Sequence, residues 1–219
     1  MKKIIVFLSF LILTNLNSSE IKNKTFFNFG VGIPLTGGLA IQTLKYDSIN
    51  KISLFSFSTK GVMISFPIDY IINLSSKYSI GFGDRFGTGY IYDFLVSNSN
   101  RITIENKFVL IHQFGNILNK KFYLFENSVN LMGVFLFDSS NCNFLFYYGF
   151  GLFSGYSFIL KNNKIKMSIG GSFDFYHKND SGDIPFYDSN NNIILKYASI
   201  NTFLIHFGIE YRIQFNFEK

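Results

Sequence analysis

Apolar and polar residues alternate one by one along most of this chain. The last segment is the clearest example, because every odd-numbered position from Phe203 to Phe217 carries Phe, Ile or Tyr. The even-numbered positions between them are mostly polar residues or glycine. Successive side chains of a β-strand point to opposite faces, so this pattern predicts a strand over residues 201–217 with one wholly apolar face. That face is longer than the roughly 9–11 residues with which a tilted strand crosses a membrane.

The same alternation recurs in the rest of the chain. Apolar faces of this kind run through residues 27–33, 62–72, 78–92, 102–114, 144–160 and 165–175. The opposite faces carry glycine, serine and scattered charges, which suits the crowded lumen of a narrow barrel. Residues 122–137 are less regular, and the change of parity at Glu126 and Asn127 predicts a β-bulge there.

Short polar segments separate these runs and predict turns. They occupy residues 73–76, 115–119, 138–141 and 161–163, and longer polar segments at 93–100 and 178–195 predict outer loops. The strand number depends on residues 34–58. Strands at 39–46 and 48–58 would bring the total to ten, whereas a long first loop would leave eight; both counts are even, as single-chain bacterial barrels require. Ten is favoured, because residues 51–72 have the pattern of a hairpin.

The composition favours a membrane wall over a soluble core. Hydrophobic residues make up 47% of the chain and charged residues only 16%, whereas about a quarter of a soluble domain is charged. The 29 Phe and 13 Tyr are more rings than the core of so short a soluble chain can bury, and a lipid-facing wall can use all of them. A soluble β-sandwich, the alternative, would concentrate branched aliphatic residues on its buried faces and place charge outside.

The N-terminus has the layout of a secretory signal peptide. Lys2 and Lys3 precede an apolar stretch over residues 4–13, and a polar segment with small residues follows up to Ser19. This layout predicts a signal peptide over residues 1–19 and a mature domain over 20–219; an uncleaved N-terminal anchor is the alternative. No later apolar run approaches the roughly 18 residues of a membrane helix.

An exported, apolar chain without a membrane helix must satisfy its backbone groups in another way. In lipid, strands can do so only by closing into a barrel. The sequence therefore predicts an all-β fold, a transmembrane antiparallel up-and-down β-barrel of 8 to 10 strands. Its expected place is the bacterial outer membrane, reached through the signal-peptide pathway, with outer-membrane lipid as its first partner.

On this pattern the mature chain resembles the small bacterial outer-membrane β-barrel proteins, the group that includes the transmembrane domain of outer membrane protein A. The likeness rests on the alternation throughout and on a terminal strand that carries Tyr211, Ile213, Phe215 and Phe217. It implies that the barrel-assembly machinery, which reads an aromatic residue at the end of the last strand, is a partner during biogenesis. Glu218 and Lys219 extend past the final Phe, which departs from that pattern.

The charge balance argues against nucleic acid as a partner and directs attention to the lumen. Without Lys2 and Lys3 of the signal peptide, 18 basic and 14 acidic residues remain, a net charge of +4, and no run of Lys or Arg follows a groove. Seven charged residues of both signs fall on predicted lumen faces: Arg85, Glu105, Lys107, Lys166, Asp174, Glu210 and Arg212. Buried charges must be paired, so we expect an ion-pair network that stabilises the barrel. A narrow ion path is the alternative role.

Candidate chemistry is sparse. His206 shares a strand face with Glu210, but no serine lies on that face to act as a nucleophile, so we expect hydrogen bonding in the lumen as its role. Asp180, Asp183 and Asp188 make the last predicted outer loop rich in oxygen atoms. Their spacing matches no ordered calcium loop, and we interpret them as part of a solvated surface loop. We expect neither a metal nor a cofactor.

These patterns predict a function carried by loops on a common scaffold. The first hypothesis is a non-enzymatic outer-membrane barrel with a structural role in the envelope, whose outer loops meet the environment, a host or an extracellular ligand. The second is a small pore or transport barrel for ions or small solutes. The third is an outer-membrane enzyme that modifies lipid.

Overall fold

The computed structural model describes residues 24–45, 51–93, 100–116, 121–137, 142–160, 164–187 and 193–218. The predicted signal peptide over residues 1–19 lies outside this part of the chain. No helix among the described residues is long and apolar enough to cross a membrane.

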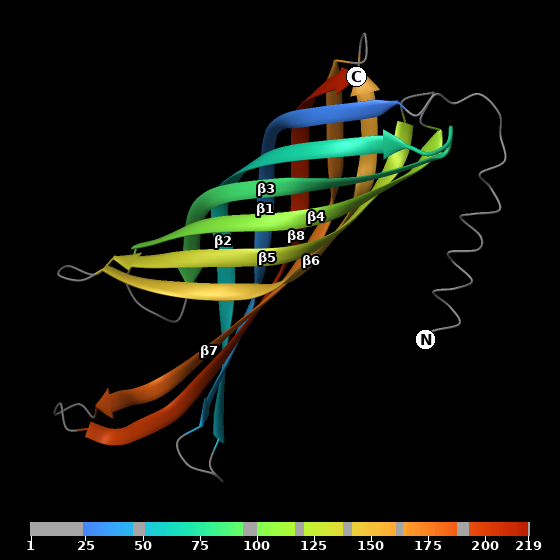
Figure 1. Ribbon diagram of the computed structural model, residues 1–219. Coiled ribbons are helices and arrows are strands. Elements are labelled where there is room, and N and C mark those ends of the chain that lie inside the picture. The colour runs from blue at the N-terminus through green and yellow to red at the C-terminus, as the bar shows by residue number, and fades with distance from the viewer. Residues whose placement is uncertain are drawn as a thin grey trace, which may run out of the picture.

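Eight antiparallel strands form a closed barrel in which each strand pairs with the next and the last pairs with the first. They are β1 (Thr25–Lys45), β2 (Lys51–Asn73), β3 (Tyr78–Asp93), β4 (Asn100–Asn116), β5 (Lys121–Phe137), β6 (Cys142–Leu160), β7 (Ile165–Tyr187) and β8 (Ile193–Glu218). The all-β, up-and-down barrel that the alternation predicts is confirmed (Figure 1). We call the end where β1 begins and β8 ends the terminal end of the barrel.

The structure has eight strands, so the prediction of ten is wrong. Residues 34–45 contain no turn at which the chain reverses its direction. β1 continues through this region with a register shift between Gly32 and Thr36, and β2 has a similar shift between Lys60 and Met63. The ladder between β1 and β8 runs without a shift from Phe26 to Lys45. A bulge absorbs an extra residue without reversing the chain, so the Pro, Gly, Ser and Thr residues here bend long strands instead of ending them.

Two other sequence expectations also change. The predicted loop over residues 178–195 is mostly strand, since β7 extends to Tyr187 and β8 begins at Ile193. β5 contains no bulge, because its ladders with β4 and β6 run without a register shift. The apparent change of parity arises because Phe122 and Leu124 are buried in the lumen, on the same face as Glu126.

Two long hairpins project beyond the rest of the barrel at the end opposite the terminal end, which we call the hairpin end (Figure 1). β2 pairs with β3 only as far as Ser58, whereas β1 and β2 stay paired to Lys45 and Lys51. In the same way β7 leaves β6 at His177 but remains paired with β8 to Tyr187.

The register makes the lumen narrow. Following directly paired residues once around the barrel from Phe29 leads back to β1 at Leu39, a stagger of ten residues. Strand number and stagger together set the width of a barrel, and eight strands leave an interior just wide enough for side chains to fill.

The outer wall is predominantly apolar, with Asp84, between the exposed Phe82 and Phe86 of β3, as a charged exception. On β8, Phe207 and Ile209 are 57% and 59% exposed, and the terminal-strand residues Tyr211, Ile213, Phe215 and Phe217 lie on the same face. Arg212, between them, is 2% exposed and faces the lumen. An apolar wall of this kind belongs in lipid, where a closed barrel leaves no backbone group unpaired at a sheet edge.

Candidate functional site

Charged side chains fill the middle of the lumen, and Glu126 on β5 lies at their centre. Its Oε1 atom accepts hydrogen bonds from Arg85 Nη2 of β3 at 2.5 Å and from Arg212 Nη1 of β8 at 2.6 Å. All three side chains are at most 3% exposed. The Glu126 carboxylate thus links β5 to β3 and to β8 across the lumen.

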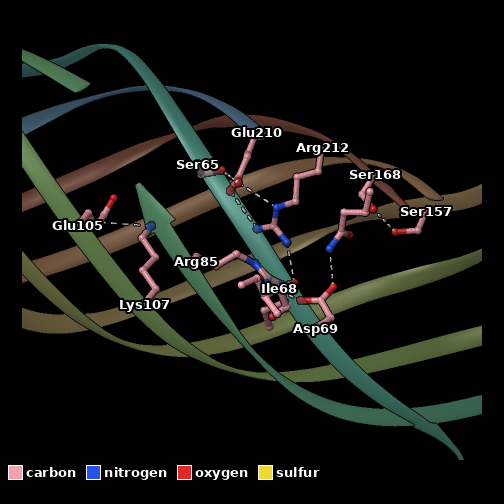
Figure 2. A network of polar contacts seen from close by, with 12 residues as sticks. Ser65, Ile68, Asp69, Arg85, Glu105, Lys107, Ser157, Ser168, Glu210 and Arg212 are labelled. Carbon is pink, nitrogen blue, oxygen red and sulfur yellow. Dashed lines mark hydrogen bonds and ion pairs between the residues drawn. The ribbon is translucent and has the colours of Figure 1, made fainter. Parts of the chain in front are cut away.

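Each arginine also binds a second carboxylate. Arg85 Nη1 donates to Asp69 Oδ1 of β2, and Arg212 binds Glu210 in a bidentate manner, with Nε to Oε1 and Nη2 to Oε2 both at 2.9 Å. Ser65 Oγ donates to Glu210 Oε1 at 3.2 Å. Figure 2 shows this chain of contacts running from Ser65 through both arginines to Asp69. Bidentate, charge-assisted bonds fix the guanidinium groups in orientation as well as in position.

The network continues toward the terminal end on the wall formed by β2, β7 and β8. Asp69 Oδ2 accepts a hydrogen bond from Gln214 Nε2 at 2.8 Å and pairs with Lys166 Nζ at 3.4 Å. Next to it the hydroxyls of Ser157 and Ser168 lie 2.7 Å apart (Figure 2). These side chains are fully buried, so their hydrogen bonds replace the water they would otherwise bind.

A second group of ion pairs lies on the side of the network facing the hairpin end. Lys107 Nζ is 2.8 Å from Asp174 Oδ1, 2.7 Å from Asp174 Oδ2 and 3.5 Å from Glu105 Oε1. Asn130 Nδ2 donates to Asp174 Oδ1 at 3.0 Å. This group therefore links three strands, β4, β5 and β7.

The two groups together nearly balance in charge. Their carboxylates are those of Asp69, Glu105, Glu126, Asp174 and Glu210, and their cations are those of Arg85, Lys107, Lys166 and Arg212. A buried charge is tolerable only when it is paired and hydrogen-bonded. The arrangement is therefore stable as a whole but sensitive to the loss of one member.

Apolar side chains close the lumen on either side of the charges. One buried cluster lies toward the hairpin end and consists of Ala40, Met132, Val134, Tyr147, Tyr176 and Leu204. The other lies toward the terminal end, on β4 to β6, and consists of Val109, Ile111, Leu124 and Phe153. The Arg212 guanidinium stacks on the Phe153 ring at 4.1 Å from its centroid, which joins the ionic and apolar parts.

Little space remains between these side chains. A cavity of about 30 Å³ is lined by members of both ion-pair groups, including Arg85, Lys107, Glu126 and Arg212. Because one water needs roughly 10–15 Å³ measured in this way, the cavity has room for about two waters. In the part of the chain that the structure describes, the lumen around the charged groups is thus nearly filled, and this packing supports the barrel mechanically.

The structure places all seven charged residues predicted for the lumen on its inner face. Two further charged members were missed, Asp69 and Glu126. Asp69 could have been included, since it alternates regularly with Ile68 and Tyr70. Glu126 was hidden by the supposed bulge in its strand.

Other candidate residues have no such common site. His206 is buried in the lumen with its ring 5.8 Å from that of Tyr176. Asp180 and Asp183 belong to the extension of β7, and Asp188 lies outside the described residues. Within the described part of the chain, no group of three or more His, Cys, Asp or Glu residues is placed to hold a metal ion.

Comparisons with known proteins give no family for this chain but several solved outer-membrane structures. No protein-family model matches the chain, and no curated protein matches it. Among solved structures, outer membrane protein OprG from Pseudomonas aeruginosa is similar to this chain. The matched region covers 87% of this chain and 95% of OprG, with 8% identity and a TM-score of 0.47. The outer membrane protease OmpT from Escherichia coli covers 93% and 100%, with 10% identity and a TM-score of 0.47. Neisserial surface protein A covers 84% and 95%, with 10% identity and a TM-score of 0.40.

Proposed function

We propose that the protein is a non-enzymatic barrel of the bacterial outer membrane that meets its surroundings through the hairpins and loops of the hairpin end. The single observation that carries this proposal is the filled lumen, where buried ion pairs and two apolar clusters occupy the interior. Since the described part of the lumen leaves little room around these charges, we assign recognition to the parts that extend beyond the barrel. The closed network gives those parts a rigid base in the envelope.

Placement in a membrane is supported by the apolar outer wall. Exposed Phe, Ile, Leu and Val side chains on this wall would be unfavourable in water and are favourable in hydrocarbon. The proposed route is export by the signal peptide over residues 1–19 and folding by the barrel-assembly machinery. Oriented like other such barrels, the protein has its short turns in the periplasm and its long hairpins outside.

The two long hairpins are the proposed contact elements. β1 with β2 and β7 with β8 extend past their neighbours, and the ladder between β1 and β8 continues to the pair Lys45 and Ser199. The four strands therefore form one continuous sheet that carries the connections at residues 46–50 and 188–192. Loops held by a rigid scaffold are the usual site of recognition, so we expect an extracellular ligand to bind here.

An epitope tag inserted at Asn191 tests this orientation. We expect antibody to label the tag on intact cells, because the connection between β7 and β8 lies at the proposed outer end. A matched insertion at Asn162, between β6 and β7 at the terminal end, should be labelled only after the outer membrane is permeabilised. Labelling of Asn162 but not Asn191 on intact cells would invert the topology and remove the basis for loop recognition.

A further inference from the structure

A lysine stands at the start of every odd-numbered strand at the terminal end of the barrel. Lys24, Lys77 and Lys164 directly precede β1, β3 and β7, and Lys121 is the first residue of β5. All four side chains are exposed. Since odd strands are separated by one even strand, the four lysines are spread around the whole rim. We call these four residues the lysine collar.

The backbone holds this collar in place. The carbonyl oxygens of Lys24, Lys77 and Lys164 each accept a hydrogen bond from a backbone N–H of the neighbouring even strand. The donors are Asn73 of β2 at 3.0 Å, Gly115 of β4 at 2.9 Å and Asn216 of β8 at 2.8 Å. Lys121 pairs within the β4–β5 ladder, opposite Asn116. The lysine backbones are therefore part of the barrel, and only their side chains extend from the rim.

Few of these charges are neutralised by the protein itself. Glu218 at the end of β8 forms an ion pair with Lys24. Lys77, Lys121 and Lys164 form no ion pair with any residue in the described ranges. The rim thus presents three exposed cations without a protein counter-charge among the described residues.

Tyrosines lie beside the collar on the membrane-facing wall. Tyr123, two residues from Lys121 on the same face of β5, is 67% exposed. Its ring packs edge-on against Tyr156 of β6, with centroids 5.5 Å apart. Tyrosine favours the boundary between hydrocarbon and water, because its ring is apolar and its hydroxyl is polar. The two tyrosines therefore place the boundary between hydrocarbon and water next to Lys121, which lies just outside the apolar wall.

We propose that the lysine collar binds the phosphodiester headgroups of anionic phospholipids in the leaflet that surrounds the terminal end. Lysine ammonium groups complement the lipid phosphate, and cations next to an anionic surface each strengthen the attraction. At the best-defined position, Lys121 meets the phosphate while Tyr123 and Tyr156 donate from their hydroxyls. The acyl chains then follow the apolar wall past Phe125. The assignment of this leaflet to the periplasmic side rests on the proposed function.

Native mass spectrometry of the detergent-purified barrel tests the proposal. The probe is an equimolar mixture of phosphatidylglycerol and phosphatidylcholine with identical acyl chains. We expect bound phosphatidylglycerol to exceed phosphatidylcholine at least about fivefold, the effect of roughly one lysine near a lipid surface. The triple variant Lys77→Gln, Lys121→Gln and Lys164→Gln should reduce the excess to less than about twofold.

A matched triple variant, Lys45→Gln, Lys51→Gln and Lys196→Gln, removes the same charge from strands at the hairpin end. It should keep the full excess of phosphatidylglycerol. Equal binding of the two lipids to the native protein, or the same loss in both triple variants, would overturn the proposal. Loss of the excess on adding inorganic phosphate would also overturn it, since the collar would then bind small anions and not lipid.

Failure of the proposed function can be distinguished from failure of the lysine-collar proposal. Each variant is first checked for a heat-dependent shift on a denaturing gel, which reports a folded barrel. If Asn191 is labelled only from the periplasm while the lipid preference persists, the orientation is wrong and the collar stands. If Asn191 is outside and the preference is absent, only the collar is wrong.

Discussion

Replacing Glu126 with Gln is expected to lower the free energy of unfolding by about 3–5 kcal/mol, the usual cost of breaking a buried ion pair by removing one partner. The Glu126 carboxylate neutralises Arg85 and Arg212 at once, and all three side chains are buried. The neutral amide keeps the size of the side chain but leaves both guanidinium groups short of counter-charge. Urea titration of the protein folded in lipid vesicles measures the effect.

Glu218→Gln is the matched control for this experiment. Glu218 pairs with Lys24 at the rim, where the two side chains are 36% and 52% exposed. An exposed pair of this kind contributes about 0–1 kcal/mol, so the control should change the unfolding free energy little. Equal losses in the two variants would mean that the lumen network does not hold the barrel together.

The second large effect is expected on the outer wall, at Ile213. Ile213 lies on the exposed face of β8, four residues inside Phe217 at the terminal end. Because a tilted strand crosses the membrane in about 9–11 residues, this position is close to the middle of the bilayer. Ile213→Arg should lower the free energy of unfolding by about 2–4 kcal/mol, the penalty for arginine on the lipid face at the midplane.

An arginine introduced at the membrane boundary should lower the free energy of unfolding much less. Phe217→Arg places the charge near the terminal rim, where we expect a cost of about 0–1 kcal/mol. Unfolding titrations of both variants in vesicles give the comparison. A protein that remains a soluble monomer without detergent, or equal costs at both depths, would contradict a membrane barrel.

The strand faces could be predicted from the sequence because each position has only two possible sides. The alternation over residues 201–217 assigned Ile213 to the outside and Arg212 to the inside without any knowledge of the neighbours. Strand number was harder to predict. A turn and a bulge use the same residue types, and only the unbroken ladder of β1 with β8 excludes a reversal at Pro34 to Gly38.

The lumen charges were predicted as a set but not as pairs. Pairing depends on the stagger of the strands, which brings Glu126 to the level of Arg85 and Arg212 although 41 and 86 residues separate them in sequence. Local pattern contains no information about this stagger. Glu126 itself escaped prediction because Phe122 and Leu124 face inward, so apolar residues occur on both faces of β5.

The central claim is that ion pairs and apolar side chains seal the lumen, and planar-bilayer conductance tests it most directly. Folded protein is inserted into the bilayer, and insertion is verified by the heat-dependent gel shift of the same preparation. A cavity with room for only about two waters between the charged groups predicts no stable, reproducible channel steps above those of a protein-free bilayer. Reproducible steps of constant size, present only with the folded protein, would contradict the sealed lumen and support a pore.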